Sequence, residues 1–150
     1  MARLLTTNAG DRRVRAVGRV LIYGDCVEVM WPEIFRQMCK GRFPLAVCLE
    51  NEHMNIVGFK LATMIRICKP KEVVTLTIDG SPHCVQLHMM VEEVRKLLKD
   101  ENTVFRYFVV EKGDLIEVDS RCVRTARYLS KIKKLLEVSD RNNIGISPQN

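Results

Sequence analysis

Uninterrupted apolar runs separated by polar turns dominate the middle of the chain. Residues 44–49 (PLAVCL) form such a run, which is typical of a strand covered on both faces. Residues 73–78 (VVTLTI) are rich in β-branched side chains and give the strongest strand pattern in the chain. Residues 56–68 are apolar almost all round, which predicts a helix packed on more than one side. The order strand, helix, strand indicates a layered α/β protein.

Two further stretches have the apolar spacing of amphipathic helices. The first runs from Pro82 to about Lys99, and its expected apolar face comprises Cys84, Leu87, Val91, Val94 and Leu98. The second begins at Ser120, which suits an N-cap. Its expected core stripe contains Cys122, Ala126, Leu129, Ile132 and Leu136.

Two β-hairpins are predicted, one on each side of this central part. The first spans residues 19–30 and turns at Gly24-Asp25, because Gly-Asp suits two-residue turns with positive φ. The second spans residues 103–118 and turns at 111–114. Both contain the pattern Gly-Asp-x-β-branched-Glu-Val, and a helix follows each. The first of these helices is expected to open at Trp31-Pro32.

Together these elements predict a single three-layer α/β domain with a partly parallel central sheet, of the flavodoxin-like or Rossmann-like class, with β-hairpins at both ends. We expect this domain to occupy residues 13–138. The polar residues 1–12 predict a flexible N-terminus, and the Asn-, Ser- and Pro-rich residues 139–150 predict a disordered tail. The centre of the sheet is expected to consist of strands 45–49, 73–78 and 104–110.

The composition fits one such domain. At 150 residues and 47% apolar content, the chain suits a single core. Its uncharged apolar stretches, such as residues 61–65, are far shorter than the roughly 20 residues that cross a bilayer, so no membrane is expected as a partner. The N-terminus has no signal-peptide apolar region, which favours a cytoplasmic location.

The six cysteines are widely spaced, and no C-x-x-C occurs. This spacing differs from those of zinc ribbons, ferredoxins and thioredoxins. It fits a reducing compartment better than a disulfide framework. Cys48 lies inside an apolar run, where a free thiol is expected to behave as a small hydrophobic side chain.

The net charge of +6 is concentrated at the two ends of the chain. Residues 120–141 alone contain seven Lys or Arg and two acidic residues. Such a segment suggests nucleic acid or an acidic protein as a partner, and a solvated helix face explains it equally well. Basic residues recur there at near-helical steps, at Arg121, Arg124, Lys131 and Lys134. Only Tyr128 is available for stacking on bases, so nucleic acid is allowed as a partner but not favoured.

The strongest candidate site is the turn between strand 73–78 and the helix that follows it. If this strand lies parallel to strand 45–49, the turns after both strands meet at the carboxyl edge of the sheet, where α/β proteins bind ligands. A helix that starts there would direct unpaired amides and the positive end of its dipole at the ligand. The expected binding site, which suits a phosphate-bearing ligand, comprises Gly80, Ser81, His83, Asn51 and His53.

Cys84 is the candidate catalytic residue in this turn. A helix N-terminus lowers the pKa of a thiol, and a protonated His83 would lower it further. The alternative is that Cys84 is a buried, unreactive part of the apolar helix face.

A metal site is a further hypothesis for the same turn. Cys84 and His88 are four positions apart and share a helix face, which suits two metal ligands. His53 and Cys26 would complete the set if their turns fold together. The alternative for His88 is a half-buried helix residue bonded to a carbonyl group.

Several catalytic signatures are absent. The chain contains neither G-x-x-x-x-G-K-[ST] nor G-x-G-x-x-G, so an anionic ligand would depend on the helix N-terminus alone. No G-x-S-x-G surrounds Ser81, and Pro82 removes a backbone donor that a nucleophile elbow uses. Serine hydrolysis is therefore not expected.

The run TIDGSPHCVQLH (Thr77 to His88), with ENEHMNIVG (Glu50 to Gly58) before it, resembles a set of uncharacterised prokaryotic α/β proteins that are loosely described as ferredoxin-like or iron–sulfur-associated. The likeness covers about residues 43–135. It implies a redox or iron–sulfur context and no particular catalytic residue.

The sequence therefore predicts a cytoplasmic binding or redox-accessory protein with a Cys/His site at the carboxyl edge of its sheet. Its partner would be a small molecule or a redox protein, and its cofactor a metal or iron–sulfur centre. Two alternatives are a Cys84-dependent enzyme and a basic interaction module that binds nucleic acid or an acidic protein.

Overall fold

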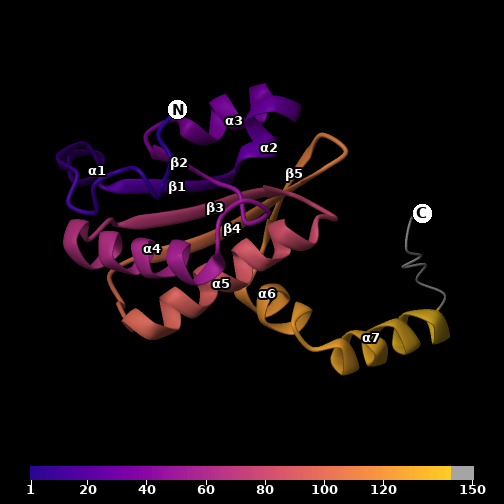
Figure 1. The fold of residues 1–150 in the computed structure, drawn as a ribbon. Coiled ribbons are helices and arrows are strands. Elements are labelled where there is room, and N and C mark those ends of the chain that lie inside the picture. The colour runs from indigo at the N-terminus through magenta and orange to yellow at the C-terminus, as the bar shows by residue number, and fades with distance from the viewer. Residues whose placement is uncertain (143–150) are drawn as a thin grey trace.

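Five strands form the central sheet of the computed structural model, which describes residues 1–142, and helices cover both faces of the sheet (Figure 1). The strands are β1 (Arg19–Gly24), β2 (Phe43–Val47), β3 (Glu72–Ile78), β4 (Val104–Glu111) and β5 (Asp114–Val118). The helices are α1 (Arg12–Val17), α2 (Asp25–Met30), α3 (Pro32–Cys39), α4 (Met54–Cys68), α5 (Pro82–Leu98), α6 (Ser120–Ala126) and α7 (Leu129–Arg141).

The strands lie in the order β2-β1-β3-β4-β5. The first four are mutually parallel, and β5 pairs with β4 in the antiparallel sense. The chain passes from β1 to β2, which lies on one side of β1, and then crosses to β3 on the other side of β1. The carboxyl ends of β1 and β3 therefore form the topological switch point of the sheet, where α/β proteins place their ligands.

Two apolar layers sandwich the sheet, as the sequence predicts. The larger layer packs under α1, α4, α5 and α6 and includes Leu61, Ile65, Leu87 and Val91. The smaller layer packs under α2 and α3 on the other face and is centred on Tyr23, Phe35 and Leu76. Figure 1 shows the two sets of helices on opposite sides of the strands. The molecule is thus an α/β protein with a mostly parallel sheet.

Helices α4 and α5 lie against each other on the larger layer. A Cβ atom at Gly58 would lie 3.2 Å from Met90 Sδ, so the glycine permits a close approach of the two helices. No helix within residues 1–142 is both long enough and apolar enough to cross a membrane.

The hairpin predicted at residues 19–30 is wrong. Gly24 ends β1 in an extended conformation, with φ −70°, and pairs with Val47 in β2. The following residues form α2, in which Val27 is buried and Asp25 and Glu28 lie in the first turn, near the positive end of the helix dipole. The second predicted hairpin is confirmed as β4–β5, and both Lys112 and Gly113 have positive φ in its turn.

The predicted centre of the sheet is also wrong in one respect. Strand β1, not β2, occupies the centre beside β3, and β2 lies at the edge. All residues of β1 after Arg19 are buried, which fits a strand that is covered on both faces. The strands at 43–47 and 72–78 are parallel, as expected, but β1 lies between them.

The N-terminal residues, which the sequence predicts to be flexible, pack onto the outer edge of β2. Ala46 donates its N–H to Ala2 O (2.9 Å), and Leu4 donates its N–H to Ala46 O (3.0 Å). The side chain of Leu4 is fully buried. These bonds cover an edge that would otherwise expose unpaired backbone groups.

The predicted final helix is two helices. It breaks at Arg127-Tyr128 between α6 and α7, and α7 continues to Arg141, into the segment expected to be a disordered tail. The rest of that expected tail, residues 143–150, lies outside the described residues. The predicted core stripe is wrong at Cys122, Leu129 and Leu136, which are exposed.

Candidate functional site

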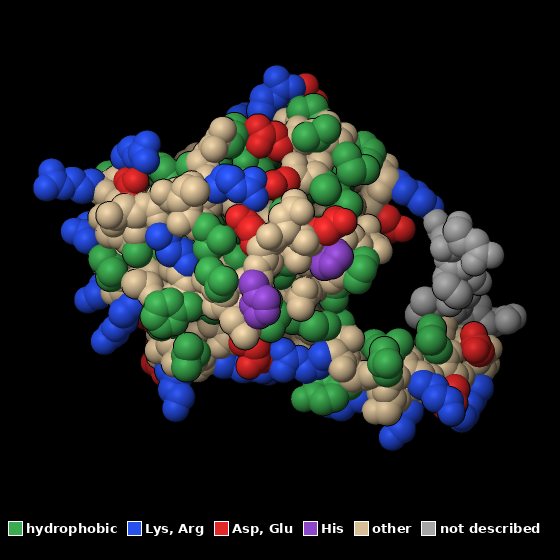
Figure 2. Space-filling model, viewed as in Figure 1, with side chains coloured by type: hydrophobic (Ala, Val, Ile, Leu, Met, Phe, Trp, Pro, Cys, Tyr) green, Lys and Arg blue, Asp and Glu red, His purple; other side chains and the backbone are tan. Residues whose placement is uncertain are grey.

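Three segments meet at the carboxyl edge of the sheet, around the switch point, and line a small cavity of about 30 Å³. They are the junction of β1 and α2 (residues 24–26), the turn after β2 (residues 48–50) and the start of α5 (residues 81–84). The cavity volume corresponds to roughly one water molecule. On the face shown in Figure 2, histidine and acidic side chains lie close together near the centre.

Three of the six free cysteines line this cavity. Cys26 is exposed, whereas Cys48 and Cys84 are partly buried. The thiols interact electrostatically, because negative charge on Cys26 or Cys48 raises the pKa of Cys84. Cys26 lies in α2, Cys48 in the turn after β2 and Cys84 in α5, so the strand order brings together three thiols that are far apart in the sequence.

Gly24 lies next to Cys84. A Cβ atom at Gly24 would lie 3.7 Å from Cys84 Sγ, an ordinary van der Waals contact, so the end of β1 adjoins the first turn of α5.

The prediction that Cys84 has a lowered pKa is wrong. Burial raises the pKa of the Cys84 thiol, and hydrogen bonding to Ser81 and to the backbone of Ile78 offsets this only in part. Desolvation disfavours the thiolate more than the helix start favours it. Cys84 is therefore a protonated thiol at neutral pH.

The start of α5 has the predicted form without a side-chain cap. Ser81 is the N-cap and Pro82 follows at the first helical position, but the Ser81 side chain makes no capping hydrogen bond. Gly80 has φ +85°, a conformation that glycine adopts without strain. Of the predicted ligand-binding residues, Ser81 and His83 line the cavity.

The other predicted ligand-binding residues, Gly80, Asn51 and His53, do not line the cavity. His53 is the N-cap of α4, and its Nδ1 accepts a hydrogen bond from the Asn55 backbone N–H at 3.2 Å. Asn51 contacts the site through a hydrogen bond from its Nδ2 to Cys48 Sγ at 3.7 Å.

Asp25 brings a carboxylate to the cavity that the sequence analysis did not identify. Its Oδ2 accepts a hydrogen bond from Arg3 Nη1 at 2.7 Å, and Arg3 also lies 3.2 Å from Glu52 Oε1. The second oxygen, Oδ1, is buried and has no hydrogen-bond partner. A buried, unpaired acceptor is costly, and it marks a place where a proton or a polar group can be received.

His88 belongs to the core and not to the site. Its Nε2 lies 2.9 Å from Thr77 Oγ1, and its ring packs against Tyr107 with 5.9 Å between centroids. Burial lowers the pKa of His88 to about 4, so the imidazole is neutral at physiological pH. The predicted role of His88 as a metal ligand therefore has no support from its surroundings.

The residues at this edge do not fit an iron–sulfur cluster. Such clusters are held by four ligands, usually thiolates, whereas three cysteines line the cavity. Within residues 1–142, no group of three or more His, Cys, Asp or Glu side chains is arranged to hold a metal ion. The predicted set of Cys84, His88, His53 and Cys26 is not assembled, because both histidines are engaged elsewhere.

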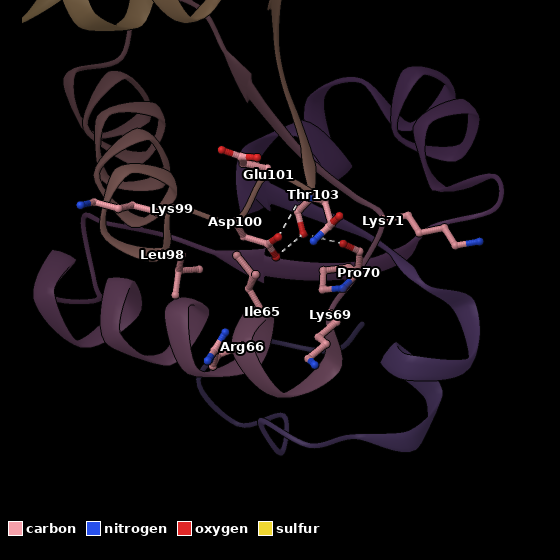
Figure 3. Close-up of a pocket in the computed structure, with 11 residues that line it drawn as sticks. Ile65, Arg66, Lys69, Pro70, Lys71, Leu98, Lys99, Asp100, Glu101 and Thr103 are labelled. Atoms are coloured by element: carbon pink, nitrogen blue, oxygen red, sulfur yellow. Dashed lines mark hydrogen bonds between the residues drawn. The ribbon is translucent and has the colours of Figure 1, made fainter.

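A larger pocket of about 440 Å³ lies at the opposite, amino edge of the sheet (Figure 3). It lies between the C-terminal ends of α4 and α5, near the starts of β3 and β4. Within it Thr103 Oγ1 donates to Pro70 O at 2.7 Å and lies 3.0 Å from Asp100 Oδ2. A neighbouring pocket of about 620 Å³ is larger still and is lined by Arg95, Tyr107 and Ser120 among others. Volume therefore favours these two pockets, but the sheet topology and the reactive side chains favour the carboxyl edge.

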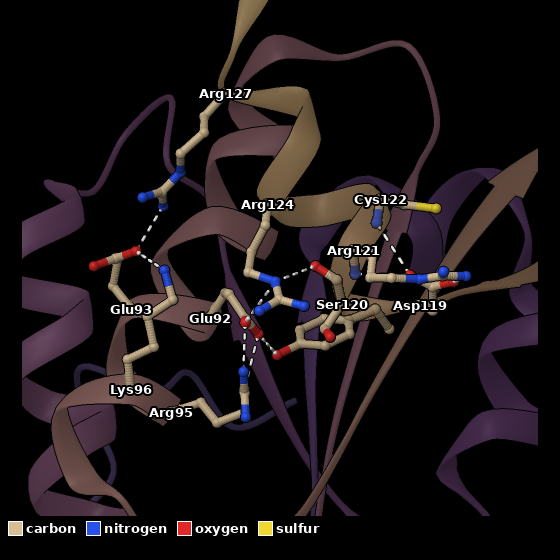
Figure 4. Close-up of polar contacts among 11 residues, drawn as sticks. Glu92, Glu93, Arg95, Lys96, Asp119, Ser120, Arg121, Cys122, Arg124 and Arg127 are labelled. Atoms are coloured by element: carbon tan, nitrogen blue, oxygen red, sulfur yellow. Dashed lines mark hydrogen bonds and ion pairs between the residues drawn. The ribbon is translucent and has the colours of Figure 1, made fainter. Parts of the chain in front are cut away.

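A buried carboxylate forms the other prominent polar cluster (Figure 4). Glu92 on α5 is fully buried and accepts hydrogen bonds from Tyr107 Oη (2.6 Å) and from Arg95 (2.7 and 3.0 Å). Arg124 of α6 lies 3.9 Å away. Burial opposes ionisation, but these partners outweigh it and hold the pKa of Glu92 below its usual value. The cluster ties α5 to β4 and α6.

Sequence reasoning found Cys26, Ser81, His83 and Cys84 but missed Cys48 as a site residue. Its position after a strand could have identified it. Cys48 directly follows an apolar strand, as Cys26 follows β1 within two residues. Carboxyl ends of parallel strands meet at one edge, so a cysteine just after a strand is a candidate for this edge.

The comparisons with known proteins identify the fold. Residues 16–143 match the model of a protein family described as a Rossmann-like domain. No curated protein and no solved structure matches the chain.

Proposed function

We propose that this chain, which belongs to the Rossmann-like domain family, is a thiol-redox accessory protein whose carboxyl-edge cysteines exchange a disulfide with a redox partner. The observation that carries the proposal is the convergence of Cys26, Cys48 and Cys84 on one cavity at the switch point of the sheet. Two neighbouring thiols are the minimum that such an exchange requires.

The exposure of each thiol suggests the step in which it acts. Cys26 is exposed and within reach of a partner's disulfide, so it is the attacking thiol. Its thiolate attacks one partner sulfur, forms a mixed disulfide and displaces the other partner sulfur as a thiolate. Burial and a raised pKa make Cys84 a poor first attacker, so it is assigned the second, intramolecular step, which then needs a base.

In the second step Cys84 attacks Cys26 of the mixed disulfide. A Cys26–Cys84 bond forms, the bond to the partner breaks, and the partner leaves as a dithiol. The partner thereby gains two electrons and two protons, which the two protein thiols lose. The same steps in reverse oxidise a partner dithiol.

Asp25 supplies the base that the second step needs. A protonated Cys84 thiol must lose its proton before it attacks. Asp25 lines the same cavity, and its Oδ1 has no hydrogen-bond partner. Arg3 holds the other carboxylate oxygen and fixes its orientation. Asp25 is thus a proton acceptor for the resolving thiol.

The test is a single-turnover reaction with dithiodipyridine, a small aromatic disulfide, and an excess of reduced protein. The protein carries Cys39→Ser and Cys122→Ser, which remove the accessible thiols outside the cavity. If Cys84 resolves the mixed disulfide, each reagent molecule releases two thiopyridones and leaves a Cys26–Cys84 bond that mass spectrometry detects. Cys84→Ser is expected to stop the reaction after one thiopyridone, with the adduct on Cys26.

Two further variants test the roles of Asp25 and Cys48. Asp25→Asn is expected to leave the first release unchanged and to slow the second by about 100-fold, the lower end of the range for a general base. Cys48→Ser is the matched control and is expected to retain release of both thiopyridones. Two releases from Cys84→Ser would contradict the proposal. So would iron or zinc bound in stoichiometric amount to protein purified without oxygen.

A further inference from the structure

Helix α7 extends away from the body of the molecule (Figure 1). One side of it is apolar, with a stripe formed by Leu129, Ile132, Leu135 and Leu136. Leu129, Leu135 and Leu136 are 81%, 55% and 37% exposed. The stripe therefore lies largely in solvent and not on the core of its own domain.

Such a helix needs a partner to be stable. α7 has 13 residues, and isolated helices shorter than about 12–15 residues are marginal in water. Most helices gain their stability by burying an apolar stripe. In residues 1–142, the main contacts of α7 are with the short helix α6. We therefore expect the stripe to be covered when the protein acts.

A basic pocket of about 390 Å³ lies at the base of this helix. Its lining contains five cationic side chains and one aromatic ring, namely Lys96, Arg121, Arg124, Arg127, Lys131 and Tyr128. Lys and Arg side chains are also numerous along the lower edge and on the helix in Figure 2.

Carboxylates of the body neutralise only part of this charge. Glu93 lies 2.7 Å from Arg127 and 3.0 Å from Lys96, as drawn in Figure 4. Arg124 lies 3.9 Å from Glu92, and Arg121 lies 3.1 Å from Asp119. Among the described residues, Lys131 forms no ion pair with a carboxylate and lies over the Tyr128 ring at 4.3 Å. The five cations of the pocket therefore meet three carboxylates, and an excess of positive charge remains at the base of the apolar stripe.

We propose that α6 and α7 form a docking arm, residues 120–141, for an acidic amphipathic helix of a partner protein. The apolar side of such a helix would cover the leucine stripe, and its carboxylates would face the basic pocket, which includes Lys131. This arrangement is the helix-in-groove mode of recognition, with charge complementarity at the rim.

The other occupants fit these features less well. A second copy of the arm would bring together two segments that each carry a net charge of +5. A nucleic acid backbone would satisfy the cations and leave the leucines exposed. An anionic membrane would meet the same cations, and the vesicle measurement below distinguishes it from a helical partner.

The experiment uses a fluorescent 18-residue peptide designed as an amphipathic helix, with leucine on one side and glutamate on the other. Its binding to the full chain is measured by fluorescence anisotropy, beside a scrambled peptide of the same composition. We expect the amphipathic peptide to bind at least tenfold more tightly. Leu129→Ser/Leu136→Ser and Lys131→Glu are each expected to weaken binding by at least tenfold.

Val29→Ser and Arg12→Glu are the matched controls. Val29 is 82% exposed on α2, and Arg12 is exposed on α1, so neither lies on the docking arm. Both are expected to leave peptide affinity unchanged, and circular dichroism checks that every variant is folded. Equal binding of the scrambled peptide would overturn the proposal. So would an arm-dependent dimer in light scattering, or tighter arm-dependent binding to single-stranded RNA or to anionic vesicles.

Discussion

A thiol at the start of a helix experiences two opposing effects, and Cys84 illustrates the balance. The dipole and the hydrogen bonds favour its thiolate, while burial favours the neutral thiol. Burial dominates here and raises the pKa of Cys84. In the proposed thiol exchange, Cys84 therefore acts in the slower, base-assisted step, and the exposed Cys26 makes the first attack.

His88 gives a prediction at the same scale. Its pKa is about 4 in the folded protein against 6.5 in the unfolded chain, so the unfolded state binds a proton more readily between these pH values. The free energy of unfolding therefore falls as the pH is lowered from about 6.5 to about 4, by up to about 3 kcal/mol from this residue.

Urea denaturation between pH 4 and 7 measures this dependence, and His88→Gln is the comparison. Glutamine cannot titrate, so the variant is expected to lose much less stability than the native protein over this range. Carboxylates contribute equally to both proteins and cancel in the difference. Parallel pH profiles of the two proteins would contradict the low pKa of His88.

Helix α5 connects two centres of the molecule. Its first turn lines the carboxyl-edge cavity with Ser81, His83 and Cys84, and its middle buries Glu92. The buried carboxylate joins α5 to β4 through Tyr107 and to α6 through Arg124. The base of the docking arm is therefore attached to the same helix that forms one wall of the thiol site.

Glu92→Gln tests this connection. The amide keeps the volume of the side chain but loses the charge-assisted bonds to Arg95, so we expect the free energy of unfolding to fall by about 2 kcal/mol. Glu93→Gln is the control on the adjacent residue, which pairs with cations at the surface, and should cost less than about 1 kcal/mol. Equal losses of unfolding free energy in the two variants, measured by denaturant unfolding, would mean that the buried cluster stabilises the fold no more than the surface ion pairs do.

The strand order decides the form of the whole molecule. Insertion of β1 between β2 and β3 moves the start of α2 into the centre of the carboxyl edge. Cys26 and Asp25 thereby come to lie beside Cys84. The N-terminal segment completes this edge from outside, because Arg3 reaches Asp25 while Leu4 is buried at the edge of β2.

Leu4→Ala tests the contribution of that segment to the whole fold. Leu4 is fully buried, and truncation of a buried leucine usually costs 2–5 kcal/mol, so we expect a loss of about 3 kcal/mol in unfolding free energy. Thr6→Ala is the control, because Thr6 in the same segment is exposed, and it should change stability by less than about 0.5 kcal/mol. A loss below about 1 kcal/mol for Leu4→Ala would mean that the segment is only loosely attached.

Much of the architecture is determined by the sequence itself. The apolar runs at residues 44–49 and 73–78, the helical spacing of residues 56–68 and 82–98, and the turn at Gly113 all act locally, since each pattern reflects the burial of a single element. These patterns predict the α/β class and the strand-to-helix turn that carries Ser81 and Cys84. They do not depend on which element lies beside which.

The tertiary structure decided the rest. The neighbours of β1, the convergence of Cys26 and Cys48 with Cys84, and the pairing of Arg3 with Asp25 all depend on contacts between segments distant in the sequence. The same is true of the exposed stripe on α7, whose pattern is that of a core helix. A hydrophobic pattern says that a face is to be buried, but only the packing of the chain, or of its partner, decides what covers it.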